Sequence, residues 1–91
     1  MQSKVEVVLY TRAACSLCEK ALAAIHDATM RHGLSIALAE IDVDYDLDLL
    51  TRFNDHVPVV YIAGREAFRH HVDADAFAAA VHSSPRSGDG E

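Results

Sequence analysis

Hydrophobic and polar positions alternate with two different periods in the first half of the chain. Residues 5–11 form a nearly continuous apolar run rich in β-branched side chains, which predicts a strand covered on both faces. From Ser16 to about His32, apolar residues recur every three or four positions, which predicts an amphipathic helix that ends at Gly33. Residues 35–41 predict a second strand. This order indicates a right-handed βαβ unit whose two strands are parallel.

A carboxylate-rich stretch separates the second strand from a short second helix. Residues 42–48 alternate aspartate with other side chains, as the start of a calcium-binding loop does. The calcium pattern fails, because Leu47 stands where the turn needs glycine and Phe53 stands where the bidentate glutamate is needed. The stretch therefore predicts a strand end and a helix capped by Asp44. The buried side of that helix is expected to contain Leu49, Leu50 and Phe53.

The remaining pattern predicts a β-hairpin and a last helix. Residues 59–62 and 66–69 have the composition of strands, and Gly64 supplies the tight turn between them. Asp73 can cap the last helix. Its buried face is expected to contain Ala74, Phe77, Ala78 and Val81.

Composition narrows the class of protein. The 91 residues are 51% hydrophobic, enough for one domain with its own core, which is expected to span residues 1–82. Residues 83–91 are rich in serine and glycine and are expected to be a disordered tail. A net charge of −6 without a basic patch disfavours nucleic acid as a partner. No apolar run has the length of a membrane span and the start lacks the pattern of a signal peptide, so a cytoplasmic monomer is expected.

The only two cysteines, Cys15 and Cys18, stand where the first strand gives way to the first helix. Residues three apart at a helix start have Cα atoms about 5–6 Å apart, inside the roughly 4.4–6.8 Å that a disulfide needs. Cys15 precedes the first turn, where unpaired N–H groups and the helix dipole favour its thiolate, and Arg12 adds positive charge nearby. We therefore predict Cys15 as the nucleophile and Cys18 as the partly covered resolving thiol.

Two other uses of the cysteines are weighed against redox chemistry. Their spacing supplies half of a zinc site, and six histidines are present to complete it. The adjacent His70 and His71 suit one metal poorly, because neighbours in an extended segment point to opposite faces. Buried unreactive thiols are the second alternative. A lone cysteine pair in the cytosol favours catalytic or redox-sensing use, so redox chemistry is the leading interpretation and no metal ligand is assigned.

The ordered set of elements carries a family resemblance. The order β-α-β-α-β-β-α, with C-x-x-C after the first strand and Val57-Pro58 before the third, resembles the glutaredoxin branch of the thioredoxin superfamily over about residues 5–82. Residues 9–18 look like the glutaredoxin opening, in which a basic residue stands three positions before the nucleophile. The chain is most similar to short glutaredoxin-like proteins that keep C-x-x-C. This implies a thioredoxin-like α/β fold with a four-stranded mixed sheet flanked by helices.

The resemblance implies an enzyme, a dithiol-disulfide oxidoreductase that reduces a protein or low-molecular-weight disulfide. Cys15 would attack that disulfide, and Cys18 would resolve the resulting mixed disulfide. No bound cofactor is expected, and the reductant would be glutathione or a thioredoxin-reductase-like enzyme. Two alternatives stay open: a non-catalytic binding or adaptor module of the same fold, and a metal or iron–sulfur carrier that uses the same cysteines.

The resemblance also implies four substrate-binding residues. Arg12 matches the basic residue near the thiolate and the glutathione. Pro58 would be the cis-proline that faces the cysteines, leaving the Val57 backbone free to hydrogen-bond an extended substrate. Asp73 keeps the acidic position that opens the last helix, where an N-cap is the simpler explanation.

Three departures from the glutaredoxin pattern bear on the choice of substrate. Ser16-Leu17 replaces the usual Pro-Tyr between the cysteines, and His56 replaces the threonine before Val-Pro. That histidine could titrate near neutrality or simply be solvated, and a solvated position is favoured. Residues 69–73 replace the Gly-Gly that lets glutathione approach the backbone, so their side chains could block the tripeptide or give it charged contacts. Dithiol chemistry follows from the resemblance, whereas the use of glutathione does not.

Overall fold

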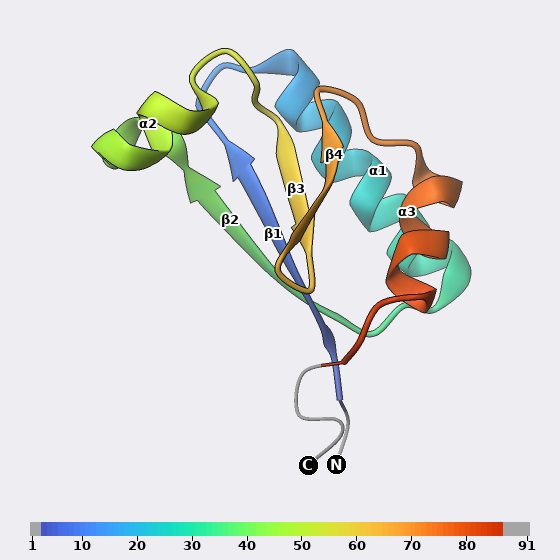
Figure 1. Cartoon of the computed structure of the whole chain (residues 1–91). Coiled ribbons are helices and arrows are strands. Elements are labelled where there is room, and N and C mark those ends of the chain that lie inside the picture. Colours follow the sequence, from blue (N-terminus) through green and yellow to red (C-terminus); the bar gives the residue numbers. More distant parts are fainter. Residues whose placement is uncertain (1–2, 87–91) are drawn as a thin grey trace.

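The computed structural model describes residues 3–86 and has the predicted thioredoxin-like α/β fold (Figure 1). The elements in chain order are β1 (Val5–Thr11), α1 (Ser16–His32), β2 (Ile36–Asp42), the 3-10 helix η1 (Val43–Tyr45), α2 (Leu47–Phe53), β3 (Val59–Ile62), β4 (Arg65–Arg69) and α3 (Ala74–His82). The four strands form one sheet in the order β2-β1-β3-β4. β1 and β2 are parallel, as the predicted βαβ unit requires, and the other two pairings are antiparallel.

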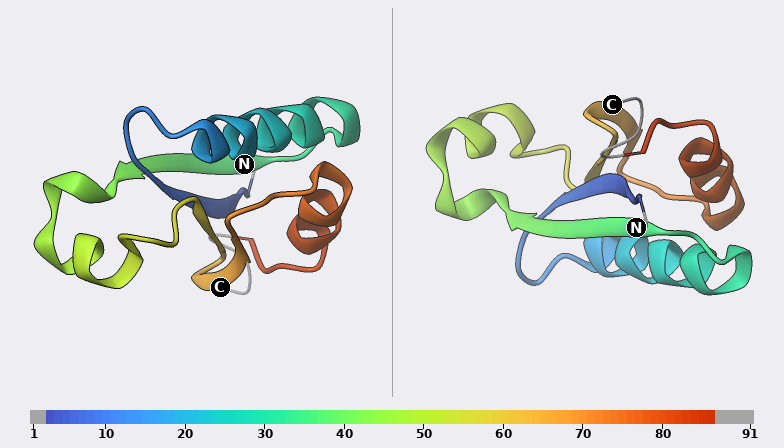
Figure 2. Two further views of the ribbon diagram at one scale, coloured as in Figure 1. Left: turned by 90° about the horizontal axis from the view of Figure 1, so that it is seen from above. Right: turned by 90° about the horizontal axis from the view of Figure 1, so that it is seen from below.

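Helices α1 and α3 cover one face of the sheet and enclose the main hydrophobic core with it. Figure 2 shows these two helices on the same side of the molecule, whereas α2 lies apart from both. The buried residues of the main core come from β1, α1, β3 and α3, and they are Val5, Val7, Leu9, Ala21, Ile25, Ala28, Val60, Ile62, Phe77, Ala78 and Val81. This core anchors the middle of α1, at whose start the cysteines lie.

A second, smaller cluster lies beneath the cysteines. Its buried members are Cys18, Val43, Phe53, Val57 and Val59. The rings of Tyr10 and Tyr61 pack on Phe53, with centroids 4.8 and 6.2 Å from its ring. This cluster connects η1 and α2 to the cysteines and to the loop before β3, so it sets the distances within the candidate site.

Several local predictions need correction. β1 is not covered on both faces: Val5, Val7 and Leu9 are buried, while the alternate residues are half-buried or exposed. This follows because α1 and α3 pack on one face only. β2 runs one residue further than expected, and Arg65 belongs to β4 instead of the turn. Gly64 does supply a turn with positive φ, as predicted, together with Ala63.

The predicted N-cap at Asp44 is wrong. Asp42 caps η1, and Asp46 caps α2 by accepting the N–H groups of Asp48 and Leu49. Asp44 lies between these two caps, within η1, and its carboxylate binds Arg12. Of the expected buried side of α2, Phe53 is buried and Leu49 and Leu50 are half-buried.

The last helix and the segment after it have fixed contacts within the described residues. Asp73 caps α3, as predicted, by accepting the N–H of Ala76 at 2.9 Å. Within the expected tail, the hydroxyls of Ser83 and Ser84 bind carbonyls of the last turn of α3, and Arg86 donates to the carbonyl of Ser3. The rest of the expected tail, residues 87–91, lies outside the described residues.

Candidate active site

The two cysteines form a disulfide at the start of α1, with Cα atoms 5.2 Å apart, as the predicted spacing requires. Cys15 is the N-cap of the helix, because its Sγ accepts the N–H of Cys18 at 3.1 Å. In the dithiol form, this donor and the positive end of the helix dipole favour a thiolate on Cys15. Helix α1 is long enough to have a full dipole, since it continues to His32 and ends at Gly33 with positive φ.

The two sulfur atoms differ in exposure. Cys15 is half-buried, whereas Cys18 is 3% exposed and belongs to the cluster beneath the disulfide. A substrate disulfide can therefore reach Cys15 from solvent, while Cys18 can attack only the sulfur that lies against it. This asymmetry agrees with the predicted order of nucleophile and resolving thiol.

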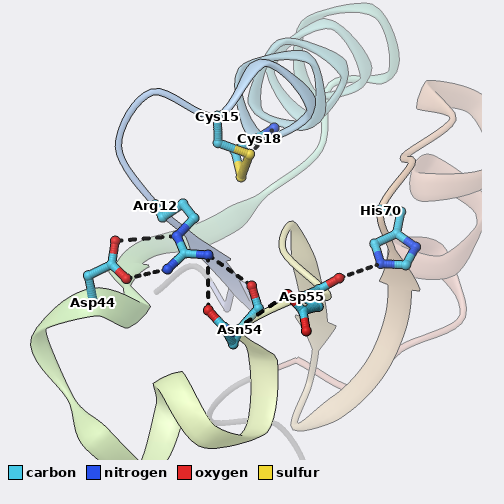
Figure 3. Close-up of a disulfide and its surroundings, with 7 residues drawn as sticks. All are labelled: Arg12, Cys15, Cys18, Asp44, Asn54, Asp55 and His70. Carbon is cyan, nitrogen blue, oxygen red and sulfur yellow. Dashed lines mark hydrogen bonds and ion pairs between the residues drawn. A yellow bond between two sulfur atoms is a disulfide. The ribbon is translucent and has the colours of Figure 1, made fainter.

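Arg12 lies beside the disulfide, but its guanidinium is bound to other residues (Figure 3). Nε and Nη2 donate to the two carboxylate oxygens of Asp44, at 3.3 and 2.5 Å. Nη1 donates to the carbonyl and side-chain oxygens of Asn54, at 2.9 and 3.2 Å. The hydrogen bond from Arg12 holds the pKa of Asp44 below its usual value, and the same bond raises the pKa of Arg12. The guanidinium thus ties the loop before Cys15 to η1 and to the end of α2.

Sequence reasoning predicted a role for Arg12 but missed its partners Asp44 and Asn54. Asp44 and Asn54 follow Arg12 by 32 and 42 positions in the sequence, so no local pattern could place the three residues together. The only signal in the sequence is the excess of aspartate over residues 42–48, which indicates possible partners for an arginine elsewhere in the chain.

The loop before β3 carries the Val57-Pro58 bond, which is cis, as the resemblance implied. Val57 is almost buried and belongs to the cluster that contains Cys18. The Pro58 carbonyl accepts the N–H of His70 at 2.7 Å. Among the hydrogen bonds of residues 3–86, none uses the backbone N–H or carbonyl of Val57.

Two histidines lie together beside this loop. The rings of His56 and His70 are 5.9 Å apart, and Nε2 of His70 lies 3.3 Å from the carbonyl of Asp55 (Figure 3). His56 is half-buried, and its Nδ1 is buried without a hydrogen-bond partner. The prediction that His56 is solvated is therefore wrong for its Nδ1 atom. His70 has a φ of 72°, within the segment that replaces the Gly-Gly of glutaredoxins.

Asp73, the fourth residue predicted to bind substrate, uses one carboxylate oxygen to cap α3. Its role toward glutathione stays a prediction. In the part of the chain that the structure describes, no three histidine, cysteine, aspartate or glutamate side chains converge as a metal site. None of the helices in that part is long and apolar enough to cross a membrane.

Comparison with known proteins places the chain in a family. The family model described as "Glutaredoxin-like domain (DUF836)" matches residues 6–82. A search of curated proteins found no match. Among solved structures, the protein XcR50 from X. campestris has 31% sequence identity and a TM-score of 0.72, with 87% of this chain and 99% of that chain covered.

Two further structures have the same fold. The protein Ne2328 from Nitrosomonas europaea is 25% identical with a TM-score of 0.73, covering 89% of this chain and 95% of its own. Thioredoxin-2, a component of malaria parasite protein secretion machinery, is 19% identical with a TM-score of 0.68, covering 92% and 86%. The first match and the family model span nearly all of the described elements, and the chain therefore belongs to the glutaredoxin-like family of the thioredoxin superfamily.

Proposed function

We propose that the chain is an enzyme, a dithiol-disulfide oxidoreductase that reduces a protein or low-molecular-weight disulfide. The observation that carries the proposal is the closed pair at the start of α1, where a half-buried Cys15 caps the helix and a buried Cys18 lies behind it. This arrangement supplies an activated, accessible thiolate and a second thiol that only the first sulfur can meet.

The reaction transfers two electrons from the dithiol to the substrate. The Cys15 thiolate attacks one sulfur of the substrate disulfide, which forms a mixed disulfide and releases the other sulfur as a thiolate that takes up a proton. Cys18, after losing its proton, attacks Sγ of Cys15 and releases the second substrate thiol. The chain is left with the Cys15–Cys18 disulfide, which an external dithiol or two molecules of a monothiol must reduce.

The loop before β3 is the proposed place where an extended substrate binds. Val57 lies in the same cluster as Cys18, and its backbone N–H and carbonyl have no partner among the hydrogen bonds of residues 3–86. An extended segment of substrate can pair with both groups, as a strand pairs with a sheet edge. We place the reaction in the cytoplasm, where glutathione or a thioredoxin-reductase-like enzyme can return the pair to the dithiol.

A redox titration tests the proposal. The protein is equilibrated in a series of glutathione buffers until its composition is constant, and the disulfide fraction is read by mass after alkylation. We expect one reversible two-electron transition between about −180 and −280 mV. The Cys18→Ser variant should stop at a mixed disulfide with the substrate, and Cys15→Ser should form none. If the two thiols never form a disulfide, the hypothesis of a non-catalytic binding or adaptor module takes the place of the oxidoreductase. Metal in the purified protein would instead support the hypothesis of a metal or iron–sulfur carrier.

A further inference from the structure

The charged residues on one side of the disulfide are strongly unbalanced. The segment 42–55 contains five aspartates, whereas Arg12 and Arg52 are the cations on or bound to it, so this side has a net charge of −3. Glu19 is adjacent to Lys20 in the sequence and Glu66 pairs with Arg69, so neither of these two carboxylates adds to the net charge. Aspartate therefore dominates the charge on the side of Cys15 where Arg12 lies.

The guanidinium of Arg12 is largely occupied by partners within the protein. Nε, Nη1 and Nη2 all donate to Asp44 or Asn54. Asp42 and Asp55 also act on the Arg12 charge at longer range, and together with Asp44 they raise its pKa. The negative charges of Asp42, Asp44 and Asp55 together therefore exceed the single positive charge of the guanidinium on which they act. A carboxylate of an incoming ligand would have to displace Asp44 before it could pair with both Nε and Nη2 of Arg12.

The surroundings of Arg52, His56 and His70 do not reverse this negative balance. Arg52 lies over the ring of Phe53 at 4.8 Å and donates to the hydroxyl of Tyr61, so it faces the aromatic cluster beneath the site. His56 and His70 pack against each other beside the loop before β3.

Building on the proposed function, we propose that the Arg12–Asp44 pair and the aspartates beside it make Cys15 select cationic disulfides over anionic ones. Glutathione disulfide belongs to the disfavoured class, because its carboxylates outnumber its ammonium groups. The favoured substrate is a disulfide flanked by lysine or arginine side chains, and electrostatic attraction would raise its rate of encounter with Cys15.

Three small disulfides of similar size and different charge test the proposal at pH 8. Cystamine is cationic, 2-hydroxyethyl disulfide is neutral, and dithiodipropionate is anionic. The single-turnover rate of the reduced protein with each is divided by the rate of dithiothreitol with the same disulfide, which removes differences in leaving group. At about 10 mM salt we expect the normalised rate for cystamine to exceed that for dithiodipropionate by about tenfold. The ratio should fall toward one at 1 M salt, where the Debye length is about 3 Å.

Three variants that each remove one carboxylate locate the effect. Asp44→Asn and Asp55→Asn should each lower the ratio of cationic to anionic rates by about threefold, the effect of one charge roughly 10 Å away in water. The matched control is Asp75→Asn, which changes the net charge equally. Asp75 pairs with Arg31 and His32 at the far end of α1, roughly 25 Å from Cys15 by helix length, so this variant should hardly change the ratio.

The outcomes separate this inference from the proposed function. Equal normalised rates for the two charged disulfides in the unmodified protein would overturn the inference while leaving the oxidoreductase intact. The same holds if Asp75→Asn changes the ratio as much as Asp44→Asn, because overall charge would then be responsible. Failure to reduce even the neutral disulfide would overturn the proposed function and the inference with it.

Discussion

An arginine bound to carboxylates lies near each end of helix α1, yet the two arrangements have different surroundings. At the cysteine end, Arg12 binds Asp44 and Asn54 next to the disulfide, above the smaller cluster. At the far end, Arg31 binds Asp27 within α1 and Asp75 on α3, above the main core. The Arg12 side chain is 29% exposed and the Arg31 side chain is 50% exposed.

The difference shows that similar ion pairs can serve different purposes in one small domain. Exposed pairs of this kind contribute little to the free energy of unfolding, so neither arrangement explains why the fold is stable. The far-end pairs link two helices that the core already holds together. Under our proposal, the pair at the cysteine end determines which charges a substrate meets before it reaches the sulfur of Cys15. Stability and reactivity should therefore respond to mutations at different ends.

The largest expected effect is on stability, at the far end. Phe77 is fully buried in the main core, and Phe77→Ala should lower the free energy of unfolding by about 3–5 kcal/mol. Urea unfolding of the oxidised protein measures this loss. The alkylation rate of Cys15 in the folded, reduced variant should be unchanged, whereas Phe53→Ala, in the cluster that contains Cys18, should change it. A Cys15 rate altered equally by both substitutions would contradict the separation of the two ends.

An intermediate effect on stability is expected from two helix caps, one beside the main core and one beside the smaller cluster. Asp73 caps α3 over the main core, and Asp46 caps the short α2. Each replacement by alanine should cost about 1 kcal/mol. Asp73→Ala should lower the global midpoint of urea unfolding, whereas Asp46→Ala should mainly speed amide hydrogen exchange within α2. Uniformly faster exchange across the domain in Asp46→Ala would show that α2 unfolds only together with the core.

The smallest effect is the pH dependence of the two pairs. Hydrogen bonds to Arg12 and to His32 are the main causes that hold the pKa values of Asp44 and Asp75 below their usual values. A lowered carboxyl pKa stabilises the fold above the pKa of the unfolded chain, about 3.9, and this contribution disappears as the pH falls through the folded-state value. Urea unfolding of Asp44→Asn and Asp75→Asn should therefore differ from the unmodified protein at pH 6, and each difference should shrink as the pH falls below about 3.9. A difference that stays constant as the pH falls would mean that the carboxylate charge is not responsible.

Most of the fold could be predicted from the sequence, because its main signals are local. The period of apolar residues defined α1 and the strands, and Gly33 and Gly64 marked the ends that need positive φ. The cysteine spacing alone predicted a pair that can close. The position of the cysteines at the helix start and their ability to form a disulfide could therefore be predicted from the sequence.

The rest depends on contacts between distant parts of the chain. Asp42, Asp44 and Asp46 have equal propensity to cap a helix, so propensity could not distinguish the caps, Asp42 and Asp46, from the partner of the distant Arg12, Asp44. The left-handed conformation of His70 has no local signal either, because histidine rarely adopts it. The extent to which β1 is covered could not be derived from its own residues, since it depends on where α1 and α3 pack.

The cap at the start of α1 has a consequence for observing the protein at work. The sulfur that reacts is also the acceptor for the amide of Cys18, so every change in the bonding or charge of Cys15 alters the hydrogen bond of one backbone N–H. In a nitrogen-15 NMR spectrum, thiolate, mixed disulfide and closed disulfide should give that amide three different chemical shifts. The helix therefore contains its own reporter of the proposed catalytic cycle, and no added dye or tag is needed to follow it.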